Sequence, residues 1–306
     1  MASRWLLNLN TATPILVGID DLALVDIDDT VKEVHGYKKQ GAGFGYSHVR
    51  GLNALLAIIS TGLSAPIIIG SRLRNGPTNS ARVAAMVSIT ARMNPLVKAA
   101  IATIPDTDWT TTKHTKAILD ETTGRWISVA EVAGIPFTRF GSKKEHERIT
   151  GRLVVRQIPE LNKKADVGQA TLVEMFRFHT FFTTSTLDTV TADKTHRHHA
   201  IIEQTNSDMK ASALAHLPSG RFDANAAWLI LACIAFNLTR AVGTLASTDL
   251  GKATTATVRR KLITVAARVA TSARRVTLPL PEHWPWETGW AAMFATTFAP
   301  SGHATT

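Results

Sequence analysis

The chain has 306 residues, of which 45% are hydrophobic and 19% are charged, a composition typical of a globular protein and too apolar for a disordered chain. Lys and Arg total 34 against 24 Asp and Glu, which gives a formal net charge of +10 at pH 7. A positive balance of this size attracts polyanions, so nucleic acid is the expected partner. One cysteine excludes the class of small proteins stapled by disulfides.

That cysteine, Cys233, lies in an apolar run and is expected to be a small buried hydrophobe, in keeping with a reducing cytoplasm. The first residues carry neither the charged and apolar regions of a signal peptide nor a cleavage site. The longest apolar run, Ala226 to Leu238, is bounded by Asp223 and Arg240. We interpret it as a core helix and expect no membrane span.

The first elements are predicted to be strands. An apolar run from Leu22 to Ile27 enters Asp28, Asp29 and Thr30, and because these polar residues are typical of turns, the strand is expected to deliver acids to its carboxyl end. A turn is expected at residues 41–46, and buried strands are expected at Leu52 to Ile58 and at Pro66 to Ile69. This order predicts the antiparallel start of a mixed sheet.

The middle of the chain is predicted to be strand and loop. Ser80 to Ala85 could open a helix, but Met86 to Ala91 follows at once as a strand, which leaves no room for the long helix of an α/β layer. Short apolar runs separated by Thr, Pro and charged residues predict three further strands, at Trp126 to Val132, Arg152 to Arg156 and Phe176 to Thr183.

The last third is predicted to be helical. Helices are expected at Lys194 to Lys210 and at Ala224 to Leu245. Thr254 to Arg275 contains six basic residues and no acid, which predicts a helix with a positive face that includes Arg259 and Arg260. Prolines then end regular structure before a tail rich in Trp, which is expected to pack on the body of the protein.

Two neighbouring acids form the first candidate site. Because side chains alternate along a strand, Asp26 and Asp28 face one side and Asp29 the other. Carboxylates placed in this way can hold Mg²⁺ and leave room for a phosphate of the substrate. The alternative is an ordinary solvated turn rich in Asp, and the spacing alone favours that alternative.

The second candidate site lies on the helix predicted at Lys194 to Lys210. His196, His199, Glu203 and Lys210 are separated by three, four and seven residues, so they share one face. Glu203 could complete a carboxylate metal site while Lys210 and the histidines bind DNA phosphate. A zinc site of His196, His199 and Glu203 is a rival interpretation, although the H-E-x-x-H pattern is absent. The third interpretation is a polar helix surface with exposed histidines and no site.

Several ordered motifs resemble the insertion-sequence thirteen-eighty group of bacterial DDE transposases, which is related to the insertion-sequence four superfamily. The resemblance covers nearly the whole chain, and the ordered series is more specific than any single motif. The motifs are Val25-Asp-Ile-Asp-Asp-Thr30, Glu33 to Ala42, Gly45-Tyr46, Gly51 to Leu56, Arg72-Leu-Arg74, Ser88 to Arg92, Thr150 to Arg156, Glu203 with Lys210, His216 to Gly220, Ala226-Ala-Trp228 and Phe236 to Arg240.

The resemblance implies an α/β fold with an RNase H-like mixed sheet and flanking helices, interrupted by a β-rich insertion. It assigns the first catalytic Asp to Asp28, with Asp26 as a substitute, and the closing Glu to Glu203. A Tyr, an Arg and a Lys accompany this Glu in the family, and their positions here hold His196, His199 and Lys210. Only the Lys is retained in kind, because imidazoles lack the permanent charge of Arg.

A second Asp of the family is missing from its expected place. Residues 78–87, between Arg72-Leu-Arg74 and the Ser88 strand, contain no acid. The next acids, Asp106, Asp108 and Asp120, follow that strand and are on its wrong side. We interpret the gap as an internal deletion. The amino-terminal DNA-binding region that the resemblance implies is also expected to be missing or abbreviated.

The sequence therefore predicts four regions: 1–85, the first part of the catalytic core; 86–190, the insertion; 191–250, the second part of the core; and 251–306, a basic helix and tail. The implied reaction is Mg²⁺-dependent cleavage and transfer of DNA strands by a metal pair roughly 3.5 to 4 Å apart. The pair is expected to be incomplete here, at Asp28, Glu203 and Asp26, so we predict little or no strand transfer.

The expected partner is DNA, the terminal inverted repeats of the element, bound by Lys210, His196, His199, Arg259 and Arg260 and in a homodimer on DNA. The expected location is the bacterial cytoplasm, at the nucleoid. Two alternatives are a catalytically dead DNA-binding remnant, which would retain DNA in a salt-sensitive way without cleavage, and the product of a decayed reading frame, which would unfold without cooperativity.

Overall fold

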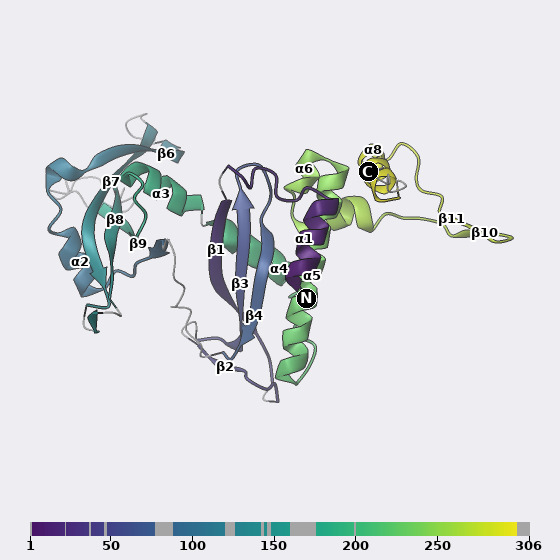
Figure 1. Ribbon diagram of the computed structural model, residues 1–306, viewed down its shortest axis with the longest axis horizontal. Coiled ribbons are helices and arrows are strands. Elements are labelled where there is room, and N and C mark those ends of the chain that lie inside the picture. Colours follow the sequence, from purple (N-terminus) through teal and green to yellow (C-terminus); the bar gives the residue numbers. More distant parts are fainter. Residues whose placement is uncertain are drawn as a thin grey trace, which may run out of the picture. The chain divides into compact units, whose positions relative to one another are not determined.

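The structure, a computed structural model, describes residues 2–21, 23–36, 38–45, 48–76, 88–119, 126–141, 144–145, 148–159, 176–198 and 200–298. The chain divides into two compact units. The first unit contains Met1–Ser80 and Ala200–Thr306, and the second contains Ala81–His199. Both combine helices with antiparallel strands (Figure 1), so the α/β class predicted from the sequence is confirmed.

The first unit is built on a small antiparallel sheet. Its strands are β1 (Ala23–Glu33), β2 (Gly43–Phe44), β3 (Arg50–Thr61) and β4 (Ile67–Arg74), and β3 pairs with each of the other three. The antiparallel start predicted from the sequence is confirmed. Every pairing among the described strands is antiparallel, so the RNase H-like mixed sheet stays a prediction.

The predicted end of the first strand is wrong. β1 continues through Asp28 and Asp29 to Glu33 instead of turning after Ile27, because it pairs with β3 along its full length, from Ala23 opposite Thr61 to Glu33 opposite Gly51. Cross-strand pairing outweighs the turn preference of the Asp pair. The acids therefore lie in the middle of a strand.

Helices cover one face of this sheet. They are α4 (Ala200–Ala211) and α5 (Phe222–Ala246). Ile202 and Met209 of α4 and Phe236 of α5 are buried in one cluster with the sheet residues Leu56 and Ile58. Burying side chains of this size stabilises a fold by about 1.5–3 kcal/mol each, so this cluster fixes both helices on the sheet.

Helix α5 matches the predicted core helix closely. Its length and apolar composition would also satisfy a membrane span, but half of its most apolar window is buried inside the protein. It also buries polar side chains that the sheet and neighbouring helices satisfy. Asn237 accepts a hydrogen bond from Ile68 N (3.0 Å) and donates one to Ile68 O (2.8 Å). These contacts are those of a core helix in a globular unit.

The predicted strand-rich middle forms the second unit. Its sheet has the order β5 (Ser88–Thr90), β9 (Phe176–Thr183), β8 (Ile149–Pro159), β7 (Trp126–Arg139) and β6 (Thr110–Leu119). Two helices, α2 (Pro95–Ile101) and α3 (Thr189–His198), accompany it. The strand predicted at Phe176 to Thr183 is confirmed at both ends, and residues 80–85, where the sequence left no room for a long helix, lie outside the described residues.

The helix predicted from Lys194 to Lys210 is confirmed on both sides of His199, which itself lies outside the described residues. Helix α3 ends at His198 in the second unit, and α4 begins at Ala200 in the first unit. His196 belongs to the second unit and Glu203 and Lys210 to the first, so the common face predicted for these residues and His199 stays a prediction.

The long basic helix predicted from Thr254 to Arg275 is also wrong. The described helices here are α6 (Thr248–Gly251), α7 (Thr255–Val258) and a π-helix at Arg259–Ile263, after which β10 (Ala270–Ser272) and β11 (Arg275–Thr277) form a hairpin. Its positive charges repel one another with no acid among them, and its Val and Thr residues favour strands.

The Trp-rich tail packs on the first unit, as predicted. It contains a helix that the sequence reasoning missed, α8 (Glu287–Phe298). Trp286 and Trp290 pack with Met293 against Leu250 and Leu262. The prolines just before α8 predicted irregular structure, so its apolar repeat was not recognised as a helix. The first helix, α1 (Ala2–Ala12), likewise packs Leu6 and Leu9 beside a second small core of the same unit.

Cys233 provides a test of the packing. It lies on α5 and is buried in the core of the first unit, and this burial raises the pKa of its thiol to about 11. At pH 8 only about one thiol in a thousand would be ionised. We expect Cys233 of the native chain to react very slowly with a thiol reagent at pH 8. After denaturation, one equivalent of the reagent should react with each chain. Prompt reaction of the native chain would contradict this packing.

Candidate active site

Asp26 and Asp28 lie on the face of the first sheet that the helices cover. In the antiparallel pairing Asp26 is opposite Ile58 and Asp28 is opposite Leu56, and cross-strand partners project to the same side. Ile58 and Leu56 both belong to the core beneath α4 and α5. The alternation predicted for these acids is therefore confirmed, and both carboxylates face α4.

Helix α4 brings a polar stripe to Asp28. Asn206 donates a hydrogen bond from Nδ2 to Asp28 Oδ2 at 3.1 Å. Glu203 and Lys210 lie three residues before and four residues after Asn206, so all three side chains share one side of the helix. Glu203 is exposed.

A pair of lysines adds positive charge beside this stripe. Burial lowers the pKa of the Lys210 ammonium, and the nearby charge of Lys32 lowers it further, while Asp28 opposes both effects. Lys32 lies four residues after Asp28 on β1, so it projects to the same face. Two ammonium groups held this close repel each other, and an anion placed between them would relieve the repulsion. The sequence reasoning missed Lys32.

The third acid of the motif, Asp29, has a structural role on the other face of the sheet. Its Oδ2 accepts hydrogen bonds from Asn53 Nδ2 at 2.6 Å and from Arg74 Nη2 at 2.7 Å. Arg74 also donates to Asn53 Oδ1 from Nε at 3.0 Å and from Nη2 at 2.8 Å. The three side chains satisfy one another and join β1, β3 and β4.

A further acid that the sequence reasoning passed over, Asp208, joins the helices. It forms an ion pair with Arg240 of α5 at 3.1 Å and accepts hydrogen bonds from Thr255 N at 2.9 Å and Thr255 Oγ1 at 2.5 Å. Burial lowers the pKa of Arg240, and Asp208 opposes the effect. This contact fixes α4 against α5 and α7, and thereby the stripe that faces Asp28.

Oxygen donors suited to Mg²⁺ occur around Asp28. The Oδ1 atom of Asn206 is buried and accepts no hydrogen bond within the described part of the chain, and amide and carboxylate oxygens are ligands of Mg²⁺. However, no group of three or more His, Cys, Asp or Glu side chains among the described residues is close enough to hold a metal ion. The described residues therefore do not fit a metal pair.

The remaining predicted residues lie elsewhere. His196 lies on α3 of the second unit, His199 lies outside the described residues, and Asp106 and Asp108 begin and end a short 3-10 helix in the second unit. Residues 77–87 and Asp120, which bear on the missing middle acid, also lie outside the described residues.

The basic segment is exposed. Arg259 and Arg260 project to solvent from the π-helix, while Lys261 lies over the Trp286 ring at 4.9 Å. Residues 271–279, which include Arg274 and Arg275 in the hairpin, are exposed throughout. The positive charge of this segment is therefore exposed on a short helix and a hairpin. The sequence predicted it on one face of a single helix.

Comparison with known families identifies a match in the last part of the chain. Residues 169–298 match the family model described as Transposase DDE domain group 1. No curated protein matches the chain. The matched segment covers less than half of the 306 residues and includes α4, with Glu203 and Lys210, but not Asp28 of β1. The match supports a DDE transposase and suggests a function in transposition.

The Asp29 network yields a stability prediction. Replacement of Arg74 by Met would leave the Asp29 carboxylate buried without its cation, a change that typically costs about 3–5 kcal/mol of the free energy of unfolding. Arg72→Met is the matched control, because Arg72 is an exposed arginine of the same strand, and we expect it to change stability by no more than roughly 0.5 kcal/mol. Equal denaturation midpoints for the two variants would refute the structural role of Arg74.

Proposed function

We propose that this chain is a DDE transposase of a bacterial insertion sequence, of the thirteen-eighty group, with little or no strand-transfer activity. The observation that supports this proposal most directly is the hydrogen bond from Asn206 to Asp28, because it joins α4, which carries Glu203 and Lys210, to β1, which carries Asp28. The family match independently covers that helix.

The proposed roles follow from charge and position. Asp28 and Glu203 are the first and closing acids of the site, and Asp26 is a substitute on the same face. Lys210 and Lys32 would bind a phosphate of the DNA through their ammonium groups, since neighbouring cations attract phosphate oxygens. Intact relatives use Mg²⁺, but no step is assigned to a metal here, because the described residues do not gather its ligands.

The exposed basic segment favours a second candidate, a DNA-binding protein without catalysis. From Lys252 to Pro281 the sequence has seven basic residues and no acid. The hairpin of β10 and β11 has the form of a two-stranded ribbon, which fits the major groove of DNA. We propose that Arg259, Arg260, Arg274 and Arg275 contact phosphates and that two copies of the chain assemble on the terminal inverted repeats of the element.

A cleavage and joining assay tests the catalytic proposal. With DNA that carries the matched terminal repeats and either Mg²⁺ or Mn²⁺, we expect retention of the DNA without strand transfer, because the acids that would hold a metal pair are incomplete. The variant Asp28→Ala should bind the same DNA as the unaltered chain does. Strand transfer that disappears in Asp28→Ala would refute the predicted loss of activity and would establish Asp28 as catalytic.

Salt dependence tests the DNA-binding proposal. The double variant Arg274→Gln, Arg275→Gln should bind duplex DNA more weakly, and the slope of log K against log salt should fall by about 0.9 for each phosphate that is no longer neutralised, or roughly 2 in total. Arg221→Gln is the control, because this exposed arginine is already paired with Asp223 at 2.8 Å. An unchanged slope in the double variant would show that the hairpin does not contact the DNA phosphates.

A further inference from the structure

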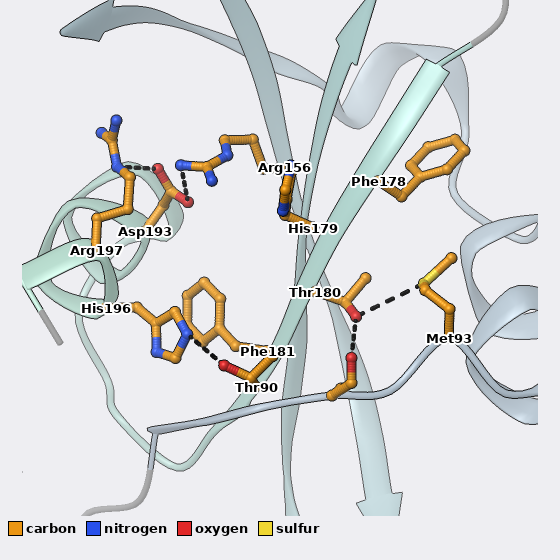
Figure 2. Close-up of a pocket in the computed structure, with 11 residues that line it drawn as sticks. Thr90, Met93, Arg156, Phe178, His179, Thr180, Phe181, Asp193, His196 and Arg197 are labelled. Atoms are coloured by element: carbon orange, nitrogen blue, oxygen red, sulfur yellow. Dashed lines mark hydrogen bonds and ion pairs between the residues drawn. The ribbon is translucent and has the colours of Figure 1, made fainter. Parts of the chain in front are cut away.

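The second unit contains a small cavity that the proposed function does not use. Its volume is about 210 Å³, several times the share of roughly 30 Å³ that one water has in the liquid. Its walls come from β8, β9, α3, the end of β5 and the segment that follows it. Figure 2 shows Arg156 and Arg197 on either side of Asp193, with His179 and His196 nearby.

The charges on the walls of the cavity do not balance. Asp193 Oδ1 lies 3.5 Å from Arg156 Nη1, and Asp193 Oδ2 lies 3.1 Å from Arg197 Nε. One buried carboxylate thus serves two guanidinium groups, each a permanent cation. Among the described residues Asp193 is the only acid on the walls, so their charges sum to one more cation than anion.

The donors of these arginines are also incompletely used. Arg156 Nε is buried and has no hydrogen-bond partner in the described part of the chain, and Arg156 Nη1 and Arg197 Nε, also buried, contact Asp193 as ion pairs without meeting the geometry of a hydrogen bond. Buried donors that remain unsatisfied are costly, particularly on charged groups. Burial lowers the pKa of Arg156, and Arg197 adds to the effect while Asp193 opposes it. An anion in the cavity would supply both the charge and the acceptors that are lacking.

Neighbouring residues hold the walls in place. Arg156 and His179 are cross-strand partners on β8 and β9, so both side chains project to the side of the sheet that α3 covers. The His196 ring is stacked on Phe181, with ring centroids 4.0 Å apart, and its Nδ1 lies 2.7 Å from Ser88 Oγ. A site built in this way is preorganised, which reduces the entropy cost of binding.

We propose that this cavity binds one phosphate group, with Arg156 and Arg197 as its ligands and Asp193 as the residue that orients both guanidinium groups. Tetrahedral oxyanions accept several hydrogen bonds at once, and arginine forks match them in geometry and charge. The phosphate could be free or part of a nucleic acid backbone. The site lies within the second unit and does not depend on the transposase proposal.

Titration of the full chain with inorganic phosphate tests the site. At constant ionic strength, phosphate should raise the melting temperature more than chloride does, since a ligand that binds only the folded state stabilises it. Arg197→Gln, which alters the more exposed of the two arginines, should weaken phosphate binding about tenfold or more. Arg139→Gln is the control, because Arg139 belongs to the same unit but does not line the cavity.

The variant Asp193→Asn separates binding from a merely structural role. It should melt at a lower temperature than the unaltered chain, but phosphate should stabilise it more, because a second uncompensated cation faces the anion. Equal responses to phosphate and chloride in the unaltered chain and in Asp193→Asn would overturn the proposal. In a second experiment, duplex DNA is added to the complex of the unaltered chain with inorganic phosphate, and ³¹P NMR shows whether the phosphate stays bound.

Release of the phosphate by the duplex would identify a backbone phosphate as the occupant, and retention would identify a free phosphate. Both outcomes require the site. The readout is independent of strand transfer and of the Arg274 and Arg275 variants, so failure here leaves the transposase proposal intact, and failure of the transposase proposal leaves this site intact.

Discussion

The burial of Ile202 and Met209 against the first sheet is the contact on which the candidate active site depends. These two residues are seven apart on α4, and both belong to the core with Leu56 and Ile58 of β3. Seven residues return to the same side of a helix, so the apolar stripe fixes how the helix is rotated. Given that rotation, Asn206 meets Asp28, and Glu203 and Lys210 follow on the same polar edge.

The two faces of β1 give Asp28 and Asp29 different surroundings. Asp28 faces α4 and a pair of lysines, whereas Asp29 is held by Arg74 and Asn53 on the opposite side. A carboxylate already saturated by a guanidinium and an amide has little capacity left for a metal or a substrate. Neighbouring acids in one motif therefore have different surroundings, and strand pairing determines which face of the sheet each acid takes.

Local patterns in the sequence predicted the elements that are decided by local chemistry. The apolar run of α5 and the strand at Phe176 to Thr183 could be recognised because burial requires long apolar segments. The facing of Asp26 and Asp28 followed from strand alternation. The partners of Asp29 and Asp208 could not be predicted, because Arg74 and Arg240 are 45 and 32 residues away in the chain and only the packed sheet and helices bring them together.

The errors have physical causes as well. Asp28 and Asp29 resemble turn residues in isolation, but the full pairing of β1 with β3 holds them in a strand. The basic segment does not continue as a helix because its positive charges repel one another and its β-branched residues favour strands. Helix α8 was not predicted because prolines precede it. The cavity of the second unit was not foreseen, because Arg156 and Asp193 come from a strand and a helix that are distant in sequence. Only the polar run around Arg197 gave any sign of it.

The contact between Asn237 and Ile68 has a consequence for solubility. Strand β4 is at an edge of the first sheet among the described strands, and its pairing with β3 shifts register beside Ile68. An open edge with free N–H and C=O groups recruits strands from other molecules. The side-chain amide of Asn237 on α5 occupies both backbone groups of Ile68. The helix therefore blocks the addition of a strand from another molecule at the point where the pairing of β4 with β3 shifts register.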